Sequence, residues 1–147
     1  MDSLDQQIVA RLVANARSSY SDIGNIVGLS APAVKRRVDK LLDTGVLRGF
    51  TAVVDPGALG WGTEAFVEVR CRGNVAPNQL KAGLLPLPEV VAAYTVSGAA
   101  DAIVHLRASG IAHLETVLER MRAISFVDGT ISAVVLSTLL ERGPAPS

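Results

Sequence analysis

The segment from residue 30 to residue 50, SAPAVKRRVDKLLDTGVLRGF, constrains the fold more than any other part of this chain. Ser30 is a residue type that caps helix N-termini, and Pro32 falls in the first turn, where its missing N–H costs little. Apolar residues then recur at helical spacing, at Val34, Val38 and Leu41. Gly45 is placed to end the helix in a left-handed conformation. The segment therefore predicts a helix with one buried face, followed by a short strand and turn over residues 46–50.

The polar side of this predicted helix is rich in cations. Residues 30–48 contain five Lys and Arg against two Asp and Glu, whereas the whole chain has a formal net charge of zero. A basic helix face fits the major groove of DNA, where cations pair with phosphates and residues near the helix N-terminus reach base edges. The alternative is that the face is simply solvated, and the preceding chain decides between the two.

Two shorter helices are predicted before this segment. Apolar residues at Leu4, Ile8 and Leu12 form a helical stripe over residues 5–14. Ser19, with Asp22 three residues later, indicates a capping box, and Gly28 closes this second helix. Its residues predicted to face inward are Ile23, Ile26 and Val27. The predicted order of elements is that of a winged helix-turn-helix. It consists of a helix, a break, a short helix, a tight turn, a basic helix and a hairpin.

Residues 63–140 predict a second domain. Alternating apolar residues indicate a strand over 65–71, and a helix opened by proline follows over 77–85. Strands over 90–97 and 102–108, a helix from Ile111 to Met121 and a last strand over 126–140 complete the pattern. This order is the ferredoxin-like βαββαβ arrangement. The last strand is apolar on both faces, so we expect one face to meet the helices and the other a second subunit.

The predicted fold class is therefore α+β, with an N-terminal winged helix-turn-helix followed by a ferredoxin-like domain. The predicted domains are a DNA-binding domain at 1–50, a linker at 51–62, a sensing and oligomerisation domain at 63–140 and a tail at 141–147.

The single cysteine, Cys71, is compatible with a reducing cytoplasm. No apolar run approaches the ~20 residues of a membrane span. Since the chain has no metal-ligand spacing, phosphate-binding loop or nucleophile elbow, we expect no metal, no cofactor and no catalytic residue.

Short motifs in the first 60 residues resemble the Lrp/AsnC (feast/famine) family of transcription regulators. The matching motifs are Ala16-Arg17-x-Ser19, Val27-Gly28-Leu29-Ser30, Val34-x-Arg36-Arg37-Val38, Gly45-Val46-Leu47-x-Gly49-Phe50 and Asp55-Pro56. One departure is Gly24, which stands where the family usually has Ala and which costs a helix ~1 kcal/mol relative to Ala. The resemblance implies a cytoplasmic regulator that is not an enzyme, binds double-stranded DNA and forms homodimers that assemble into octamers.

The recognition helix and the segment after it supply the predicted DNA contacts. Three residues, Ala33, Lys35 and Arg36, are expected nearest the bases, and Arg37, Lys40 and Arg48 are expected at phosphates. The complete predicted set is Ser30, Ala31, Ala33, Lys35, Arg36, Arg37, Lys40 and Arg48.

The loop Ser97-Gly98-Ala99-Ala100-Asp101, judged by its residue types alone, is a hairpin turn. The same family, however, carries a Ser/Thr-Gly-x-x-Asp loop here in its ligand-sensing RAM domain, where the loop lines an amino-acid effector site between subunits. The resemblance thus implies an amino acid or related metabolite as effector. Glycine lets backbone groups approach a bound carboxylate, and an aspartate suits an ammonium group. The predicted effector residues are Ser97, Gly98, Ala99, Ala100, Asp101 and, by position only, Ser132.

This loop departs from the family in one respect, because alanines surround Asp101 where the family usually has an aromatic residue. Either the pocket is enlarged for a bulkier side chain, or effector binding has been lost. Loss of the effector would make the chain an architectural DNA-binding protein. A third reading is an enzyme like the siroheme decarboxylases, which resemble the family in fold. It is disfavoured because His105 and His113 stand apart, with no adjacent Tyr.

Overall fold

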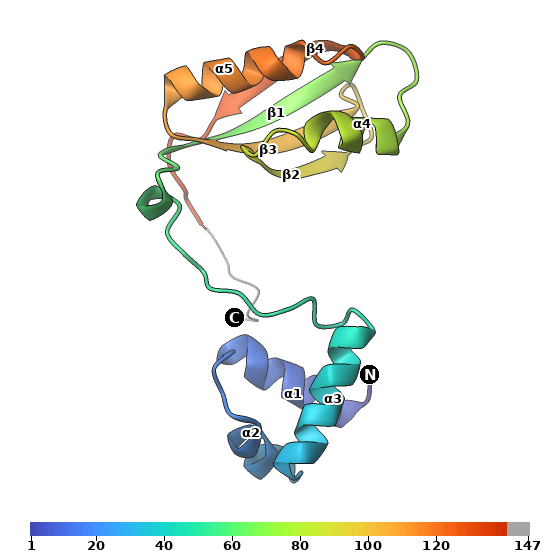
Figure 1. Ribbon diagram of the computed structural model, residues 1–147, viewed down its shortest axis with the longest axis vertical. Helices are drawn as coiled ribbons and strands as arrows, with labels where there is room; N and C mark the ends of the chain where they lie inside the picture. The colour runs from blue at the N-terminus through green and yellow to red at the C-terminus, as the bar shows by residue number, and fades with distance from the viewer. Residues whose placement is uncertain (141–147) are drawn as a thin grey trace. The chain divides into compact units, whose positions relative to one another are not determined.

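The computed structural model describes residues 1–140, and the predicted tail at 141–147 lies outside the described residues. The described chain forms two compact units, the first made mainly of Met1–Val53 and the second of Val54–Thr138 (Figure 1). Each unit has its own apolar core.

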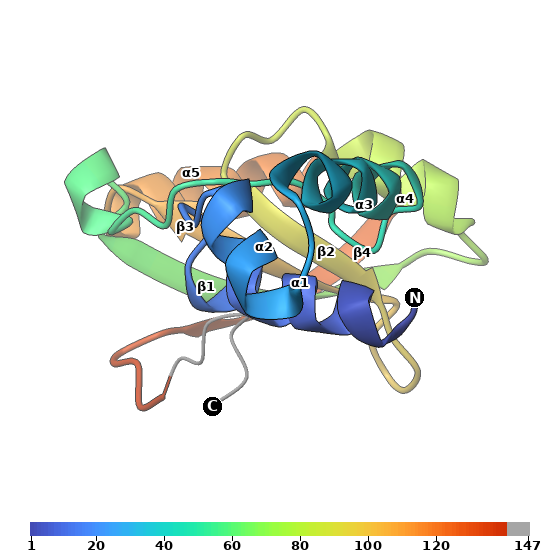
Figure 2. The ribbon, with the colours of Figure 1, turned by 90° about the horizontal axis from the view of Figure 1, so that it is seen from below.

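The first unit is a three-helix bundle of α1 (Ser3–Ala14), α2 (Tyr20–Val27) and α3 (Ala31–Asp43) (Figure 1 and Figure 2). The predicted apolar stripes form its core, which consists of Ile8, Leu12, Ile23, Val27, Val34 and Val38. The prediction that Ile26 faces inward is wrong, because 53% of this residue is exposed. Helix α1 starts at Ser3 and not at residue 5. Its start is fixed by a reciprocal capping box between Asp2 and Asp5, which the apolar pattern does not report.

The turn between α2 and α3 is tight. Gly28 ends α2 with φ +72°, and the N–H of Leu29 donates to the carbonyl of Gly24 at 2.9 Å. Ser30 then caps α3, accepting at its Oγ from the N–H of Ala33 at 3.4 Å. Ser19 caps α2 as predicted, but Asp22 accepts from the Ser19 hydroxyl and not from its backbone, so the box is not reciprocal.

The strand predicted over residues 46–50 is wrong. Gly45, with φ +73°, follows the end of α3 as predicted, and its N–H donates to Leu42. Residues 46–62 form no strand, because the described part of this unit offers no other extended segment to complete a ladder and Gly49 has φ +140°. The described unit is thus a helix-turn-helix without a paired wing.

The second unit is an antiparallel sheet with two helices. Its strands are β1 (Thr63–Cys71), β2 (Val90–Thr95), β3 (Ala102–Ala108) and β4 (Val127–Val134), in the order β2-β3-β1-β4. The helices are α4 (Pro77–Leu84) and α5 (Ile111–Arg122), which gives the predicted ferredoxin-like order. Strand β4 stops at Val134, well before the predicted residue 140; its partner β1 begins at Thr63 and therefore has no residue that could pair with 137–140.

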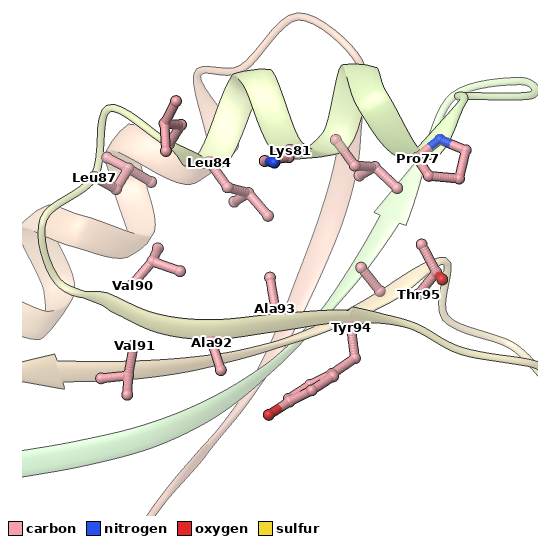
Figure 3. Close-up of a pocket in the computed structure, with 13 residues that line it drawn as sticks. Pro77, Lys81, Leu84, Leu87, Val90, Val91, Ala92, Ala93, Tyr94 and Thr95 are labelled. Carbon is pink, nitrogen blue, oxygen red and sulfur yellow. The ribbon is translucent and has the colours of Figure 1, made fainter. Parts of the chain in front are cut away.

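The two faces of the sheet differ in kind. On one face, which we call the helix face, Val67 and Val104 lie opposite each other and are fully buried with residues of α4 and α5. On the other, the open face, Phe66 pairs with His105 and Glu68 with Ile103. Figure 3 shows the same division on β2, where Ala93 points toward α4 and Tyr94 points away from it.

The segment before β1 contains a short 3-10 helix, Gly57–Leu59. Asp55 starts it by accepting the N–H of Gly57 at 3.0 Å, as its Asp-Pro-Gly sequence predicts. Trp61 follows, and its indole stacks on the imidazole of His113 with ring centres 6.4 Å apart. The only tryptophan is therefore a packing residue within the second unit.

Candidate functional site

The outward side of α3 presents a basic surface. Among the predicted DNA contacts, Ser30, Lys35, Arg36, Lys40 and Arg48 are exposed, while Ala31 and Ala33 are half-buried. Within the described residues, no carboxylate pairs with Arg36, Lys40 or Arg48. Three cations are therefore available to phosphate oxygens or base edges without the loss of an existing ion pair.

Lys35 is paired with Asp39 one turn along α3, with Nζ and Oδ2 2.6 Å apart. The hydrogen bond from Lys35 to Asp39 raises the pKa of this lysine above its ordinary value. Both side chains are well exposed, so water and salt screen their attraction. A DNA phosphate can therefore replace Asp39 as the partner of Lys35.

Arg37 is used inside the unit. Its Nη1 lies 2.8 Å from Asp2 and 2.7 Å from Asp5, and its guanidinium is 31% exposed. The hydrogen bonds that Arg37 donates, first to Asp2 and then to Asp5, raise the pKa of Arg37 above its ordinary value. Arg37 therefore ties the middle of α3 to the start of α1, and we leave it out of the DNA contacts proposed below.

In the second unit, the loop of residues 97–101 borders a pocket of about 580 Å³. The loop contributes Ser97, Ala99 and Ala100, and β2 and the turn after it contribute Thr95 and Val96. The floor consists of Glu68 and Ile103, which are paired neighbours on the open face. Sequence reasoning missed these floor residues, because alternation says that Glu68 points outward but not which residue lies beside it.

Asp101 anchors the loop to β1. Its N–H donates to the carbonyl of Val69 at 2.9 Å, and its Oδ2 accepts the N–H of Cys71 at 2.7 Å. One carboxylate oxygen is thereby committed within the chain, and the other is not hydrogen-bonded to any described residue. Asp101 thus fixes the position of the loop and still carries a negative charge at its edge.

The loop also presents backbone donors. Within the described chain, none of the N–H groups of Ser97, Gly98, Ala99 and Ala100 donates a hydrogen bond. Gly98 has φ +122°, a conformation that a side chain disfavours. Consecutive free N–H groups in a turn bind anions such as carboxylates.

Ser132 is not part of this pocket within one chain. The register pairs Ser132 with Val67, which puts its side chain on the helix face, while the pocket floor lies on the open face. A slip of one residue would reverse this result, and sequence position alone does not fix that register.

Two further polar clusters lie on the second unit. On the open face, Glu64 binds Arg107 at 2.5 Å and lies 3.6 Å from His105. Near α5, the buried Glu89 accepts from His113 and from Arg120, each at 3.1 Å. Each carboxylate is paired with a cation or an imidazole within the chain, although the buried Oε2 of Glu89 has no hydrogen-bond partner among the described residues. Neither cluster therefore leaves a nucleophile and a base free to act together.

Other site types receive no support from the described part of the chain. Residues 1–140 hold no group of three or more His, Cys, Asp or Glu that could share a metal ion. None of the described helices has the length and apolar character needed to cross a membrane.

A helix-turn-helix with a basic outer face, joined to a ferredoxin-like unit with a loop-bordered pocket, defines a DNA-binding regulator with a sensing domain. The model of the AsnC-type helix-turn-helix domain matches residues 1–42, and the model of the Lrp/AsnC ligand binding domain matches residues 64–145. The HTH-type transcriptional regulator Rv2324 of Mycobacterium tuberculosis is 51% identical over 98% of this chain and 97% of its own length. The chain belongs to the Lrp/AsnC family of transcription regulators, as its motifs predicted.

Solved structures agree with this assignment. AsnC of E. coli has a TM-score of 0.90 at 28% identity, with 99% of each chain covered. The feast or famine regulatory protein Rv3291c of M. tuberculosis, complexed with L-methionine, has a TM-score of 0.88 at 32% identity, again with 99% of each chain covered. The predicted fold class is confirmed, and the chain is a regulator of transcription and not an enzyme.

Proposed function

We propose that this protein regulates transcription by inserting α3 into the DNA major groove, under the control of an α-amino acid bound at the loop of residues 97–101. The observation that carries the DNA part is a set of cations on the outer side of α3 and just after it, Arg36, Lys40 and Arg48, which pair with no carboxylate in residues 1–140. Arg36 and Ala33, near the start of α3, read base edges. Lys35, Lys40 and Arg48 bind phosphates, and Ser30 and Ala31 position the start of the helix.

The DNA part is tested by fluorescence anisotropy with operator DNA and with unrelated DNA of equal length, at several salt concentrations. Arg36→Ala lowers operator affinity by roughly tenfold or more and reduces the preference for the operator, since a bidentate base contact contributes ~1–3 kcal/mol. Lys40→Ala weakens binding to both DNAs alike. It also reduces the slope of log affinity against log salt concentration by about one, because one phosphate contact is lost. Equal, sequence-blind losses in both variants would contradict a base contact for Arg36.

The pocket supports an amino-acid effector by its chemistry. The free N–H groups of residues 97–100 suit the α-carboxylate, and the second oxygen of Asp101 suits the α-ammonium. The related Rv3291c protein was solved with L-methionine, which supports the same class of ligand here. The alanines at positions 99 and 100 favour the larger pocket over the alternative of a lost effector.

The open face of the sheet supports a homodimer. Its exposed apolar residues, Tyr94, Phe66 and Ile131, belong to three of the four strands and are 60%, 46% and 54% exposed. Such a surface on a small unit favours burial against a second copy. We further propose that these dimers assemble into octamers, as the family resemblance implies, and that the regulator works in the cytoplasm, where it meets its DNA.

The effector part is tested by calorimetric titration of the full chain with the twenty amino acids, followed by DNA binding in the presence of any that bind. At least one should release heat and change operator affinity. No heat from any of them, together with unchanged DNA binding, would contradict the amino-acid effector.

A further inference from the structure

Glu68 is an unpaired carboxylate in the floor of the pocket. It lies in the middle of β1, and its cross-strand neighbours are apolar, Ile103 on β3 and Ile131 on β4. The residue is exposed, and no hydrogen bond or ion pair joins its carboxylate to any other residue between 1 and 140. Its charge therefore faces the pocket without a partner.

The other charged groups near the pocket differ from Glu68 in how they are paired. Glu64, on the same strand and face, is held by Arg107 and His105. Asp101 has one oxygen bound to the N–H of Cys71. Arg70 follows Glu68 on the open face but forms no ion pair with it, and Arg72 pairs with Asp128. Glu68 thus lines the pocket with no partner among the described residues, while Asp101, directly after the lining residue Ala100, is partly satisfied.

An α-amino acid with a neutral side chain offers a single positive charge. If Asp101 receives the α-ammonium, as proposed above, a neutral effector would cover Glu68 and remove its water without giving it a partner. An uncompensated carboxylate is costly to desolvate. A second positive charge on the ligand removes this cost and adds a charge-assisted hydrogen bond.

We infer that the effector is an α-amino acid with a cationic side chain, of the arginine, lysine or ornithine type, whose side-chain cation pairs with Glu68. The inference rests on the proposed function, because it requires an amino acid in the pocket. The volume of about 580 Å³ and the small side chains of Ala99 and Ala100 leave room for a long side chain. Glu68 is therefore the residue that sets specificity, while the loop and Asp101 recognise the part common to all amino acids.

The test compares L-arginine with L-citrulline, which has nearly the same length and shape but a neutral side chain. Calorimetry on the full-length protein should give an affinity for arginine about tenfold or more above that for citrulline, the size expected of a charge-assisted contact. In Glu68→Gln the two affinities should become nearly equal, mainly through the loss of arginine binding. Asp101→Asn should weaken both ligands alike.

Glu119→Gln is the matched control, since it makes the same charge change at an exposed position on α5. It should leave both affinities unchanged. Glu68→Lys gives a second readout, because it should reverse the preference toward an amino acid with an acidic side chain.

Three results would overturn the inference. The first is equal binding of arginine and citrulline by the unaltered protein. The second is a Glu68→Gln variant that loses every amino acid equally, which would make Glu68 the partner of the α-ammonium. The third is a Glu68→Gln variant whose oligomeric mass changes while its arginine preference stays. A protein that binds no amino acid at all would instead contradict the proposed effector itself.

Discussion

The carbonyl oxygen of Leu29 lies against the Cα of Gly24, so that a Cβ at position 24 would collide with it. The same glycine accepts the N–H of Leu29 at its own carbonyl. These two contacts join the last turn of α2 to Leu29, two residues before α3. They explain why a glycine stands inside a helix, and they make the turn between the two helices unusually close.

Gly24→Ala should therefore destabilise the protein, although alanine is the better helix former by ~1 kcal/mol. The backbone of residue 29 has to move away, and we expect a net loss of about 1–3 kcal/mol in unfolding free energy, typical of an overpacked site. Denaturant unfolding followed by circular dichroism measures this change, and operator affinity should fall with it.

Asn25→Ala, at the next and exposed position of α2, is the control for helix propensity. It should leave stability the same or slightly higher. If Gly24→Ala proved as stable as this control, the close approach of Leu29 would not be a constraint on the turn.

Arg37→Ala should lower the stability of the first unit. It should change the binding affinity for operator DNA and for unrelated DNA equally. The ion pairs of Arg37 with Asp2 and Asp5 tie α3 to α1. The pKa of Asp5 is lowered, first by the hydrogen bond from Arg37, and that of Asp2 is lowered by the N–H of Asp5 and then by Arg37.

The sign of the pH dependence follows from these lowered pKa values. A carboxylate with a depressed pKa stabilises the fold above its unfolded pKa of about 4, and this contribution is lost as the pH falls through the folded value. The unaltered protein and Arg37→Ala should therefore differ in melting temperature at pH 7, and this difference should shrink as the pH falls below about 4. A difference that stays the same as the pH is lowered would show that Arg37 acts by packing and not through these carboxylates.

Local patterns were enough to predict most of the fold. The spacing of Val34, Val38 and Leu41 identified the buried side of α3, and the alternation of Ala65, Val67 and Val69 identified the helix face of β1. Both describe short-range periodicity, which depends only on the chain itself. The predicted strand over 46–50 failed because a strand needs a partner, and no local pattern says whether one is present.

The candidate sites show the same limit. The loop of residues 97–101 is a candidate site only through its resemblance to the family's Ser/Thr-Gly-x-x-Asp loop, since its residue types alone indicate a hairpin turn. Its neighbour Glu68 is some thirty residues away and is brought beside it by the register of β1 with β3. Arg37 was grouped with the DNA-facing cations because helical spacing puts it at the flank of that surface. Its partners within the chain, Asp2 and Asp5, lie at the start of another helix, α1.

Glu89→Gln should destabilise the second unit. Burial by itself raises the pKa of Glu89, but hydrogen bonds from its own N–H and from His113, with the charge of Arg120, outweigh it and leave the pKa below its ordinary value. The amide keeps the shape and loses the charge, which weakens the contacts to both His113 and Arg120. We expect a loss of about 1–3 kcal/mol, seen as a lower melting temperature by calorimetry. Glu115→Gln, exposed on α5, should change nothing measurable, and equal melting of the two variants would contradict this role.

Phe66→Asp should convert the proposed dimer into a monomer. Phe66 lies near the centre of the open face, stacked on His105 with ring centres 4.7 Å apart, and it is 46% exposed. A charge there would have to be buried without a partner when a second sheet covers the face. Light scattering after gel filtration measures the mass, and circular dichroism checks that the variant stays folded.

Ile111→Asp is the control, because this residue is 63% exposed but lies on α5, so that the dimer should persist. If Phe66→Asp kept the mass of the unaltered protein, the open face would not be the dimer surface, and the exposed apolar residues of β2, β1 and β4 would need another partner.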